Sequence, residues 1–193
     1  MRCLGSDADG VADLLDDFVS GMREGGLSVT LKTFPGIGNV SADVTESIAE
    51  NTDSLMTIRD TNFVPYASGI QAGADCVMVS NAAYSKLTVK KVPAFMSQDI
   101  VTKLLREELG FDGIVMTSPL NDNVIENNYT NEFAVVEAVK AGCDLIVLPG
   151  NFKECYEALI TAVEEGRIDE KVINTSVRRI LQNKIQRGIL VLE

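Results

Sequence analysis

Four short apolar runs, separated by stretches of helical periodicity, constrain the fold of this chain more than any other feature. They lie near residues 29–33, 76–80, 114–117 and 145–148. Consecutive apolar positions are typical of strands that are buried on both faces of a parallel sheet. Strands that alternate with helices return parallel through right-handed crossovers. The sequence therefore predicts an α/β fold with four parallel strands, side by side in chain order, and helices outside them.

The segments between these runs predict the helices. Segment 54–73 reads as one helix interrupted near Pro65, and Gly25-Gly26 and Gly110 stand where two other helices should end. No low-complexity linker divides the chain, so we expect residues 1–193 to form a single β/α domain. Apolar residues recur at three- and four-residue spacing in segments 7–24, 97–109, 131–141, 152–165 and 169–187.

Composition excludes several classes of partner. The net charge is −11, whereas neutralising phosphates requires clustered Lys and Arg, so we expect no nucleic-acid partner. No apolar run approaches the roughly 20 residues that span a bilayer, so we expect no membrane span. The first residues carry no apolar signal core, which leaves the location open and slightly favours the cytoplasm.

Cysteine and histidine usage argues against a disulfide framework or a metal centre. Cys3, Cys76, Cys143 and Cys155 show no paired spacing, and the chain contains no histidine. Cys76 and Cys143 fall inside apolar runs, where cysteine usually acts as a small buried hydrophobe. We therefore expect no metal site and no cofactor.

The loop after the first run carries the most informative motif. It reads Lys32-Thr33-Phe34-Pro35-Gly36-Ile37-Gly38-Asn39-Val40-Ser41-Ala42-Asp43-Val44-Thr45. This segment resembles the Lys-His-Phe-Pro-Gly-His-Gly-Asp-Thr-x-x-Asp-Ser-His signature of family 3 glycoside hydrolases, in particular their β-N-acetylhexosaminidase branch. Every histidine of the signature is replaced. Thr33 stands at the sugar-binding histidine, Ile37 at the middle one, and Thr45 at the histidine of the acid/base Asp-His pair.

Further blocks extend the resemblance over nearly the whole chain, in the family's order: 2–7, 73–81, 93–97, 104–113 and 177–188. The resemblance implies the C-terminal half of a TIM-type (β/α)8 barrel, that is, the last four of eight strands. A lone half-barrel would expose two unpaired sheet edges and an apolar inner face. We therefore expect either a homo-oligomer or a complementing N-terminal half-barrel.

The resemblance also locates the expected chemistry. The family's nucleophilic aspartate ends the strand after Gly-Phe-Asp-Gly, and Ser118 stands there, followed by Pro119. Retaining hydrolysis needs two carboxyl groups roughly 5–5.5 Å apart, and a serine without a neighbouring base is a poor nucleophile. Asp43 is kept at the family's aspartate, but Thr45 has replaced its histidine partner. We therefore expect no confident catalytic residue at Ser118, Asp43 or Thr45.

Other residues are candidates for contact with a ligand. By the resemblance, Lys32 keeps the family's sugar-contacting lysine, and Thr33 and Asn81 stand at histidines near the site. Asp43 could accept a hydrogen bond from a sugar, or lie solvated on its loop. Asp122 and Glu126 follow Ser118 closely and are either relocated acids or ordinary surface carboxylates.

Three functions remain open. The first is a degenerate, non-hydrolytic relative of these glycosidases that binds a carbohydrate or nothing. The second is an active glycosidase with relocated carboxylates, or with a site completed by a missing N-terminal half. The third is a structural or interaction half-barrel. The replacements at Thr33, Ile37, Thr45, Asn81 and Ser118, within otherwise intact blocks, favour the first.

Overall fold

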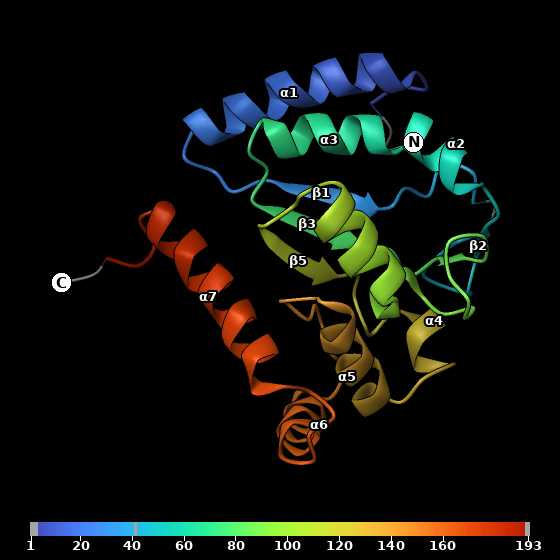
Figure 1. Ribbon diagram of the computed structural model, residues 1–193, viewed down its shortest axis with the longest axis vertical. Helices are drawn as coiled ribbons and strands as arrows, with labels where there is room; N and C mark the ends of the chain where they lie inside the picture. The colour runs from blue at the N-terminus through green and yellow to red at the C-terminus, as the bar shows by residue number, and fades with distance from the viewer. Residues whose placement is uncertain (1–3, 41, 192–193) are drawn as a thin grey trace.

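A three-stranded parallel sheet forms the centre of the computed structural model, which describes residues 4–40 and 42–191. Its strands are β1 (Thr30–Phe34), β3 (Cys76–Val79) and β5 (Ile114–Thr117), in that spatial order (Figure 1). Leu31, Val77 and Val115 stand level across the sheet, and all three are buried. The first three predicted strands, their direction and their order are therefore confirmed.

The fourth predicted strand is only partly formed. Leu145 makes a single parallel bridge to Met116, and segment 145–148 has no regular strand beyond it. The Val147 amide donates to the Thr117 hydroxyl at 3.0 Å, so a side chain takes the place of a main-chain acceptor. The predicted place and direction of this segment are confirmed, but the prediction of a regular strand is wrong. The hydrogen-bond ladder between segment 145–148 and β5 is interrupted where a side chain replaces a main-chain acceptor.

Helices surround the sheet on its outer side. In Figure 1, α1 and α3 form a layer over β1, and α5 and α6 lie beyond the last strand. The Asp7 side chain caps α1 and the Thr130 hydroxyl caps α5. The elements are α1 (Ala8–Glu24), α2 (Leu55–Asp60), α3 (Phe63–Gln71), α4 (Asn123–Glu126), α5 (Asn131–Ala141), α6 (Phe152–Glu164), α7 (Glu170–Gln186), the 3₁₀ turn η1 (Ala94–Met96) and the wider π-type helix η2 (Asp99–Glu108).

Segment 54–73 is interrupted as predicted, but the break falls at Thr61–Asn62, a few residues before Pro65. Pro65 lies in the first turn of α3, where its missing N–H is not needed. Asn62 instead donates its side-chain amide to the Pro35 main-chain oxygen at 3.0 Å. The helix is thus divided where a side chain anchors the loop after β1.

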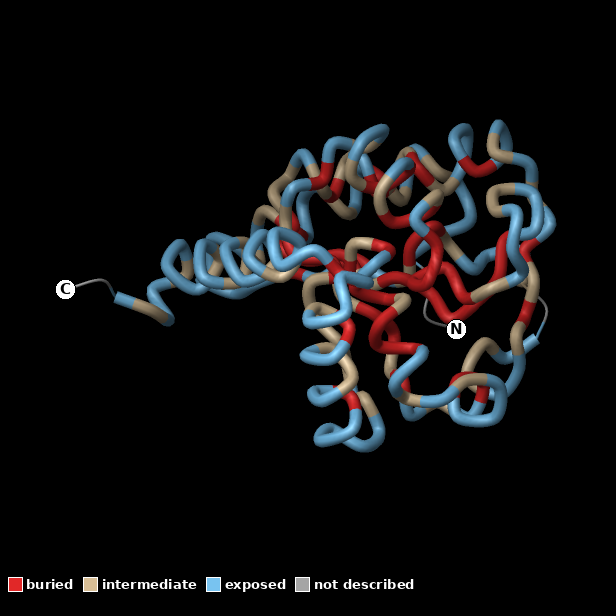
Figure 2. The backbone as a smooth tube through the Cα atoms, turned by 60° about the horizontal axis from the view of Figure 1, so that its bottom comes forward, coloured by how far each residue is buried: buried red, intermediate tan, exposed pale blue. Residues whose placement is uncertain are grey.

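α7 has no fully buried residue, and polar contacts attach it together with Ile173, which packs partly buried against a small apolar cluster. Arg187 and Asn183 contact the Asp75 carboxylate at 2.6 and 2.9 Å, and Ser176 donates to Asp144 at 2.7 Å. Asp75 and Asp144 precede β3 and the last strand segment, so α7 is held at the amino ends of the strands. Figure 2 shows this helix extending from the body with most of its length exposed.

A second, two-stranded sheet was not predicted. β2 (Glu50–Asn51) pairs in parallel with β4 (Ala83–Tyr84) and joins the end of the β1 loop to the segment after β3. Cys76, Cys143 and Cys155 are buried free thiols, and Cys3 lies outside the described residues, as does Arg2 of the first family-like block. Along the described part of the chain, no helix has the length and apolarity required to cross a bilayer.

Candidate functional site

The predicted site residues come from the carboxyl ends of three neighbouring strands, where α/β proteins place their sites. Lys32 and Thr33 lie on β1, Asn81 follows β3, and Ser118 follows β5. Lys32 is exposed and Thr33 is half-buried. The Lys32–Thr33 and Phe34–Pro35 peptide bonds are both cis. The structure therefore brings these predicted positions to one edge of the sheet.

Ser118 is hydrogen-bonded to the neighbouring strand of the sheet. Its hydroxyl donates to the Val79 main-chain oxygen at 2.8 Å, and its amide donates to the same oxygen at 2.9 Å. The side chain is buried, at 6% exposure. A hydroxyl that already donates to a backbone carbonyl, with no base as its acceptor, is not activated for attack.

Asp43 and Thr45 form a pair on the β1 loop. The Thr45 hydroxyl and amide both donate to Asp43 Oδ1, at 2.7 and 2.9 Å. Thr45 is thus the residue that hydrogen-bonds to the Asp43 carboxylate on this loop. A threonine hydroxyl does not gain or lose a proton near neutral pH as an imidazole does.

Asn81 and Asp122 form a second pair. Asn81 Nδ2 donates to Asp122 Oδ2 at 2.9 Å and to the Pro119 main-chain oxygen at 3.4 Å. Asn81 is only 1% exposed, and its Oδ1 has no hydrogen-bond donor among the described residues. A buried acceptor without a donor is uncommon and calls for an explanation.

The two pairs influence one another through charge. The pKa of Asp122 is raised by burial and by the negative charges of Asp43 and Glu46, while the Asn81 amide opposes this by lowering it. Two hydrogen bonds hold the loops together: the Val124 amide donates to the Thr45 main-chain oxygen, and Asn123 donates to Glu46, each at 2.8 Å. Asp43, Thr45, Asn81 and Asp122 thus form one cluster, which we call the acidic cluster.

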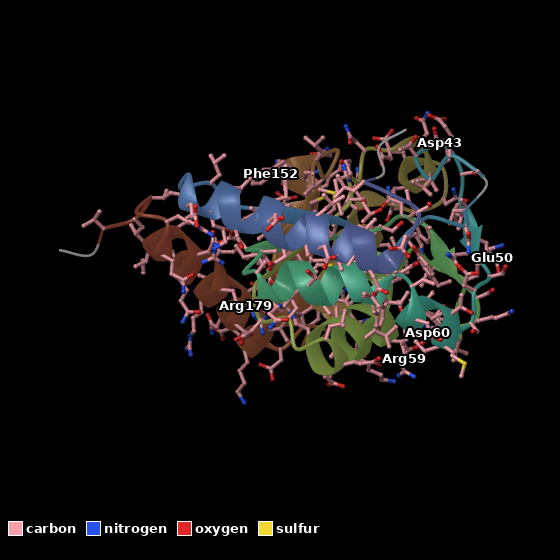
Figure 3. All side chains as sticks on the ribbon, turned by 90° about the horizontal axis from the view of Figure 1, so that it is seen from above. Asp43, Glu50, Arg59, Asp60, Phe152 and Arg179 are labelled. Carbon is pink, nitrogen blue, oxygen red and sulfur yellow. The ribbon has the colours of Figure 1, made fainter. Side chains whose placement is uncertain are left out.

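Two predicted residues stay outside the acidic cluster. Glu126 is exposed on α4, and no side-chain hydrogen bond joins its carboxyl group to Asn81 or Asp122 in the described part of the chain. Lys32 likewise forms no ion pair with Glu46 or Asp122 there. Figure 3 shows Asp43 and Arg179 well apart in the molecule.

Residues that sequence reasoning missed shape the β1 loop. The Tyr84 hydroxyl donates to the Gly36 main-chain oxygen at 2.9 Å, and Asn39 donates to Asp53 at 2.8 Å. Gly36 has a φ of 111°, and a Cβ there would lie 2.4 Å from Asn62 Nδ2, so only glycine fits. Its place in a tight turn was readable from Pro35-Gly36, whereas nothing in the sequence points to Tyr84.

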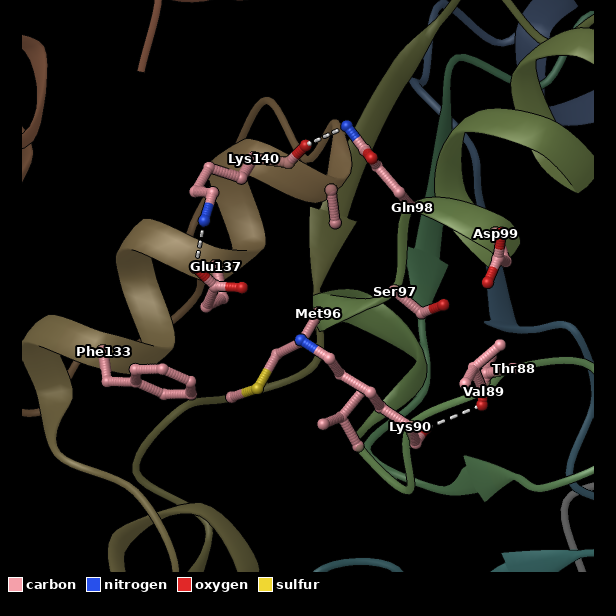
Figure 4. Close-up of a pocket in the computed structure, with 12 residues that line it drawn as sticks. Thr88, Val89, Lys90, Met96, Ser97, Gln98, Asp99, Phe133, Glu137 and Lys140 are labelled. Atoms are coloured by element: carbon pink, nitrogen blue, oxygen red, sulfur yellow. Dashed lines mark hydrogen bonds and ion pairs between the residues drawn. The ribbon is translucent and has the colours of Figure 1, made fainter. Parts of the chain in front are cut away.

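Two cavities lie away from the acidic cluster. One, of about 300 Å³, is lined by Met96, Phe133 and Lys140 among others, on the outer side of the fold between η1 and α5 (Figure 4). The other, of about 280 Å³, is lined by Arg23, Asp112 and further residues beside α7. The acidic cluster belongs to neither. Among the described residues, no three His, Cys, Asp or Glu side chains are arranged to hold a metal ion.

Comparison with known families assigns the fold. Residues 1–183 match the family described as the glycosyl hydrolase family 3 N terminal domain. The chain belongs to glycoside hydrolase family 3. The predicted family and the parallel α/β fold are therefore confirmed.

Relatives of this family 3 chain are longer than the chain itself. A β-hexosaminidase from Stenotrophomonas maltophilia (strain K279a) is 32% identical over 189 residues, which cover 98% of this chain and 53% of that enzyme. A β-N-acetylglucosaminidase/β-glucosidase from Cellulomonas fimi is 28% identical over 97% of this chain and 35% of that protein. The chain thus spans about half or less of these curated relatives.

Solved structures agree with this assignment. The family 3 β-N-acetylglucosaminidase of Paenibacillus sp. str. FPU-7 superposes with a TM-score of 0.94 at 33% identity, over 100% of this chain and 38% of that one. The β-N-acetylhexosaminidase of Beutenbergia cavernae gives a TM-score of 0.87 at 31% identity, over 95% of this chain and 54% of that one. The β/α units of this family 3 chain therefore adopt the arrangement that they have in larger enzymes.

Proposed function

We propose that this family 3 domain binds a carbohydrate without hydrolysing it. The observation that carries the proposal is the state of Ser118, whose hydroxyl donates to Val79 at the position where the family resemblance places a nucleophilic carboxylate. A serine supplies neither the nucleophile nor the negative charge that an oxocarbenium-like transition state requires.

The acid/base position supports the same conclusion. Thr45 stands where the resemblance places a histidine, and it hydrogen-bonds to Asp43 at 2.7 Å without offering a proton that titrates near neutral pH. Losing one catalytic group typically costs several orders of magnitude in rate. The loss of both leaves a site that can bind but lacks the family's chemistry.

Capacity for binding remains at the same edge. The carboxylates of Asp122 and Asp43 offer acceptors to sugar hydroxyls, and the exposed Lys32 offers donors. The relatives named above act on β-linked hexosaminides or glucosides by their names. A carbohydrate of that class is therefore the ligand that we propose.

Two assays test this function. Aryl β-N-acetylglucosaminide and β-glucoside substrates should give no turnover, with the Stenotrophomonas maltophilia β-hexosaminidase as a positive control. Titration with a methyl hexosaminide, followed by NMR, should shift the amide signals of Asn81 and Asp122. Absence of any shift would contradict binding, and turnover above the blank would contradict the loss of activity.

One observation favours a second candidate, an active glycosidase with relocated carboxylates. Burial and the charge of nearby Asp43 raise the pKa of Asp122, and a glycosidase requires a carboxyl group that can hold a proton beside a second carboxyl group. This reading predicts turnover that Asp43→Ala or Asp122→Ala abolishes, with a pH profile that follows the pKa of Asp122. The same substrates therefore separate the two candidates.

We also propose that the domain works with a partner. Phe152, Tyr156 and Ile160 recur every fourth residue along α6 and are 73%, 57% and 45% exposed, although such side chains are usually covered. Met78 and Met116 are also only half-buried on the side of the sheet that carries Lys32. Self-association or a complementing half-barrel would cover both surfaces. Light scattering that shows a stable monomer, without binding of a hydrophobic dye, would contradict this.

A further inference from the structure

We propose that two copies of this chain form a two-fold dimer in which α7 of each copy packs against α1 of the other. This inference rests on the proposal that the domain works with a partner, and it names that partner and the two surfaces that meet. Both helices present apolar side chains to solvent, and the exposed charges beside these side chains are opposite in sign.

The first observation is the orientation of α7. Side chains spaced three and four residues apart bind aspartates at the amino ends of the strands, and these side chains are Ser176, Arg179, Asn183 and Arg187. Leu181 stands two residues from both Arg179 and Asn183, which is about 200° around a helix. Val177, Leu181 and Ile185 therefore point away from the body, and they are 46%, 42% and 39% exposed. α7 thus turns an apolar side to solvent, the reverse of an ordinary surface helix.

α1 presents a second apolar surface. The helix buries Val19 and packs on α3 over β1. Leu14 and Phe18 stand one helical turn apart and are 53% and 56% exposed, so they form one continuous patch. Asp13 and Asp17 directly precede these two residues and form no ion pair in the described part of the chain. The apolar patch of α1 is therefore bordered by negative charge.

The exposed apolar side of α7 is bordered by positive charge. Arg178 and Lys184 stand three residues before and after Leu181, which places one on each side of the apolar stripe, and neither forms an ion pair among the described residues. Two α7 helices would bring like charges together, whereas α1 offers the opposite charge. α6 fits α7 less well, because Lys153 pairs with Glu157 at 3.8 Å and partly neutralises its acidic side.

The positions of the two helices suit a two-fold dimer. α1 lies over β1, an edge strand of the central sheet, whereas α7 contacts β5 and α5. α7 also extends from the body, where a second copy can reach it (Figure 2). A two-fold axis turns one pairing of α1 with α7 into two equal pairings, so the assembly closes at the dimer.

Light scattering coupled to gel filtration tests the dimer. We expect a dimer at micromolar concentration, with a dissociation constant that rises with added salt because the paired charges lie at the surface. Leu181→Ser and Phe18→Ser should each raise the dissociation constant at least about tenfold, as the loss of a central apolar contact does. Met56→Ser is the matched control, since Met56 is 70% exposed on α2 and belongs to neither surface. A thermal melt of each variant checks that it is folded.

Charge reversal tests which helices meet. Asp13→Lys with Asp17→Lys in one chain, or Arg178→Glu with Lys184→Glu in another, should each weaken the dimer. A mixture of these two chains should dimerise again, because both contacts of the mixed dimer then join opposite charges. A single chain with all four changes should also dimerise, and it keeps the net charge of −11.

The other outcomes overturn the inference and separate it from the proposal on which it rests. A monomer that binds a hydrophobic dye would overturn the dimer and leave a complementing half-barrel as the partner, whereas a monomer that binds no dye would overturn both. A dimer that neither Leu181→Ser nor Phe18→Ser weakens would place the interface on another surface, such as α6. Failure of the two charge-reversed chains to dimerise together would show that α1 and α7 do not face one another.

Discussion

The hydroxyl of Ser118 donates a hydrogen bond to the main-chain oxygen of Val79, 2.8 Å away. This contact joins the ends of β5 and β3 at the point where the family resemblance expects a carboxylate. A side chain that completes the sheet in this way is part of the scaffold. Replacing Ser118 should therefore change the free energy of unfolding as well as the chemistry of the site.

Restoring the carboxylate alone should not restore activity. Ser118→Asp places a charge beside the Val79 oxygen in a buried position, which should lower the free energy of unfolding by about 1–3 kcal/mol. Ser118→Ala, as the control, should lower it by about 1 kcal/mol. Urea denaturation measures both. Hydrolysis of an aryl β-N-acetylglucosaminide by Ser118→Asp would show that a single replacement had silenced the site.

The raised pKa of Asp122 predicts a pH-dependent effect on stability. A carboxyl group whose pKa is higher in the folded state than in the unfolded state binds more protons when folded. Folding stability therefore falls as the pH rises from the unfolded pKa through the folded pKa. Asp122→Asn removes this loss and should stabilise the protein by about a few tenths of a kcal/mol at neutral pH, since the group is partly exposed.

A control for Asp122 is Asp60→Asn, which makes the same substitution at a carboxyl group exposed at the end of α2. Urea unfolding at neutral pH and below the ordinary pKa of 3.8 gives the comparison. A stabilisation by Asp122→Asn that persists unchanged in acid would rule out the electrostatic origin.

Arg187 should be important for the attachment of α7. It contacts both oxygens of Asp75, whose side chain is 5% exposed, at 2.6 and 2.7 Å. Arg187→Ala leaves that carboxylate with less compensation, so a loss of about 3 kcal/mol in unfolding free energy is expected. Arg167→Ala removes an exposed pair with Glu165 and should cost less than about 1 kcal/mol. Equal effects of the two variants would contradict this account.

Gly36→Ala should distort the loop that carries the acidic cluster. Gly36 has a φ of 111°, and an added Cβ would come within 2.4 Å of Asn62 Nδ2. We expect about 1–3 kcal/mol of destabilisation and weaker sugar binding. Gly38→Ala is the matched control, because nothing lies within 4 Å of a Cβ there. Thermal melts and NMR titration of both variants check the difference, and similar behaviour would disprove the local cause.

The sequence predicted the order and direction of the strands because buried parallel strands leave continuous apolar runs, as at 76–80 and 114–117. It did not predict that Thr117 would supply its hydroxyl to Val147, since one side-chain contact leaves no periodic signal. The helix break was predicted near Pro65, a few residues from its place at Asn62, for a similar reason. Pro65 is the stronger local signal, but tertiary contact with Pro35 decides where the chain turns.

Much of the candidate site came from the family motif rather than from physical patterning. Asp43, Asn81 and Ser118 could be placed because matching blocks flank them. Asp122 was one of two candidate acids, and only its contact with Asn81 distinguishes it from Glu126. Asn81 and Asp122 are 41 positions apart in the chain, and no periodicity in a single sequence predicts such a contact.

The hydrogen bond from the Val124 amide to the Thr45 main-chain oxygen has a consequence for how the site moves. It is a backbone link between the loop after β1 and the first turn of α4, so neither segment can move outward without breaking it. Hydrogen exchange at the Val124 amide would therefore proceed only when the two segments separate. The amide resonance of Val124 would therefore report the opening of the site in the absence of any ligand.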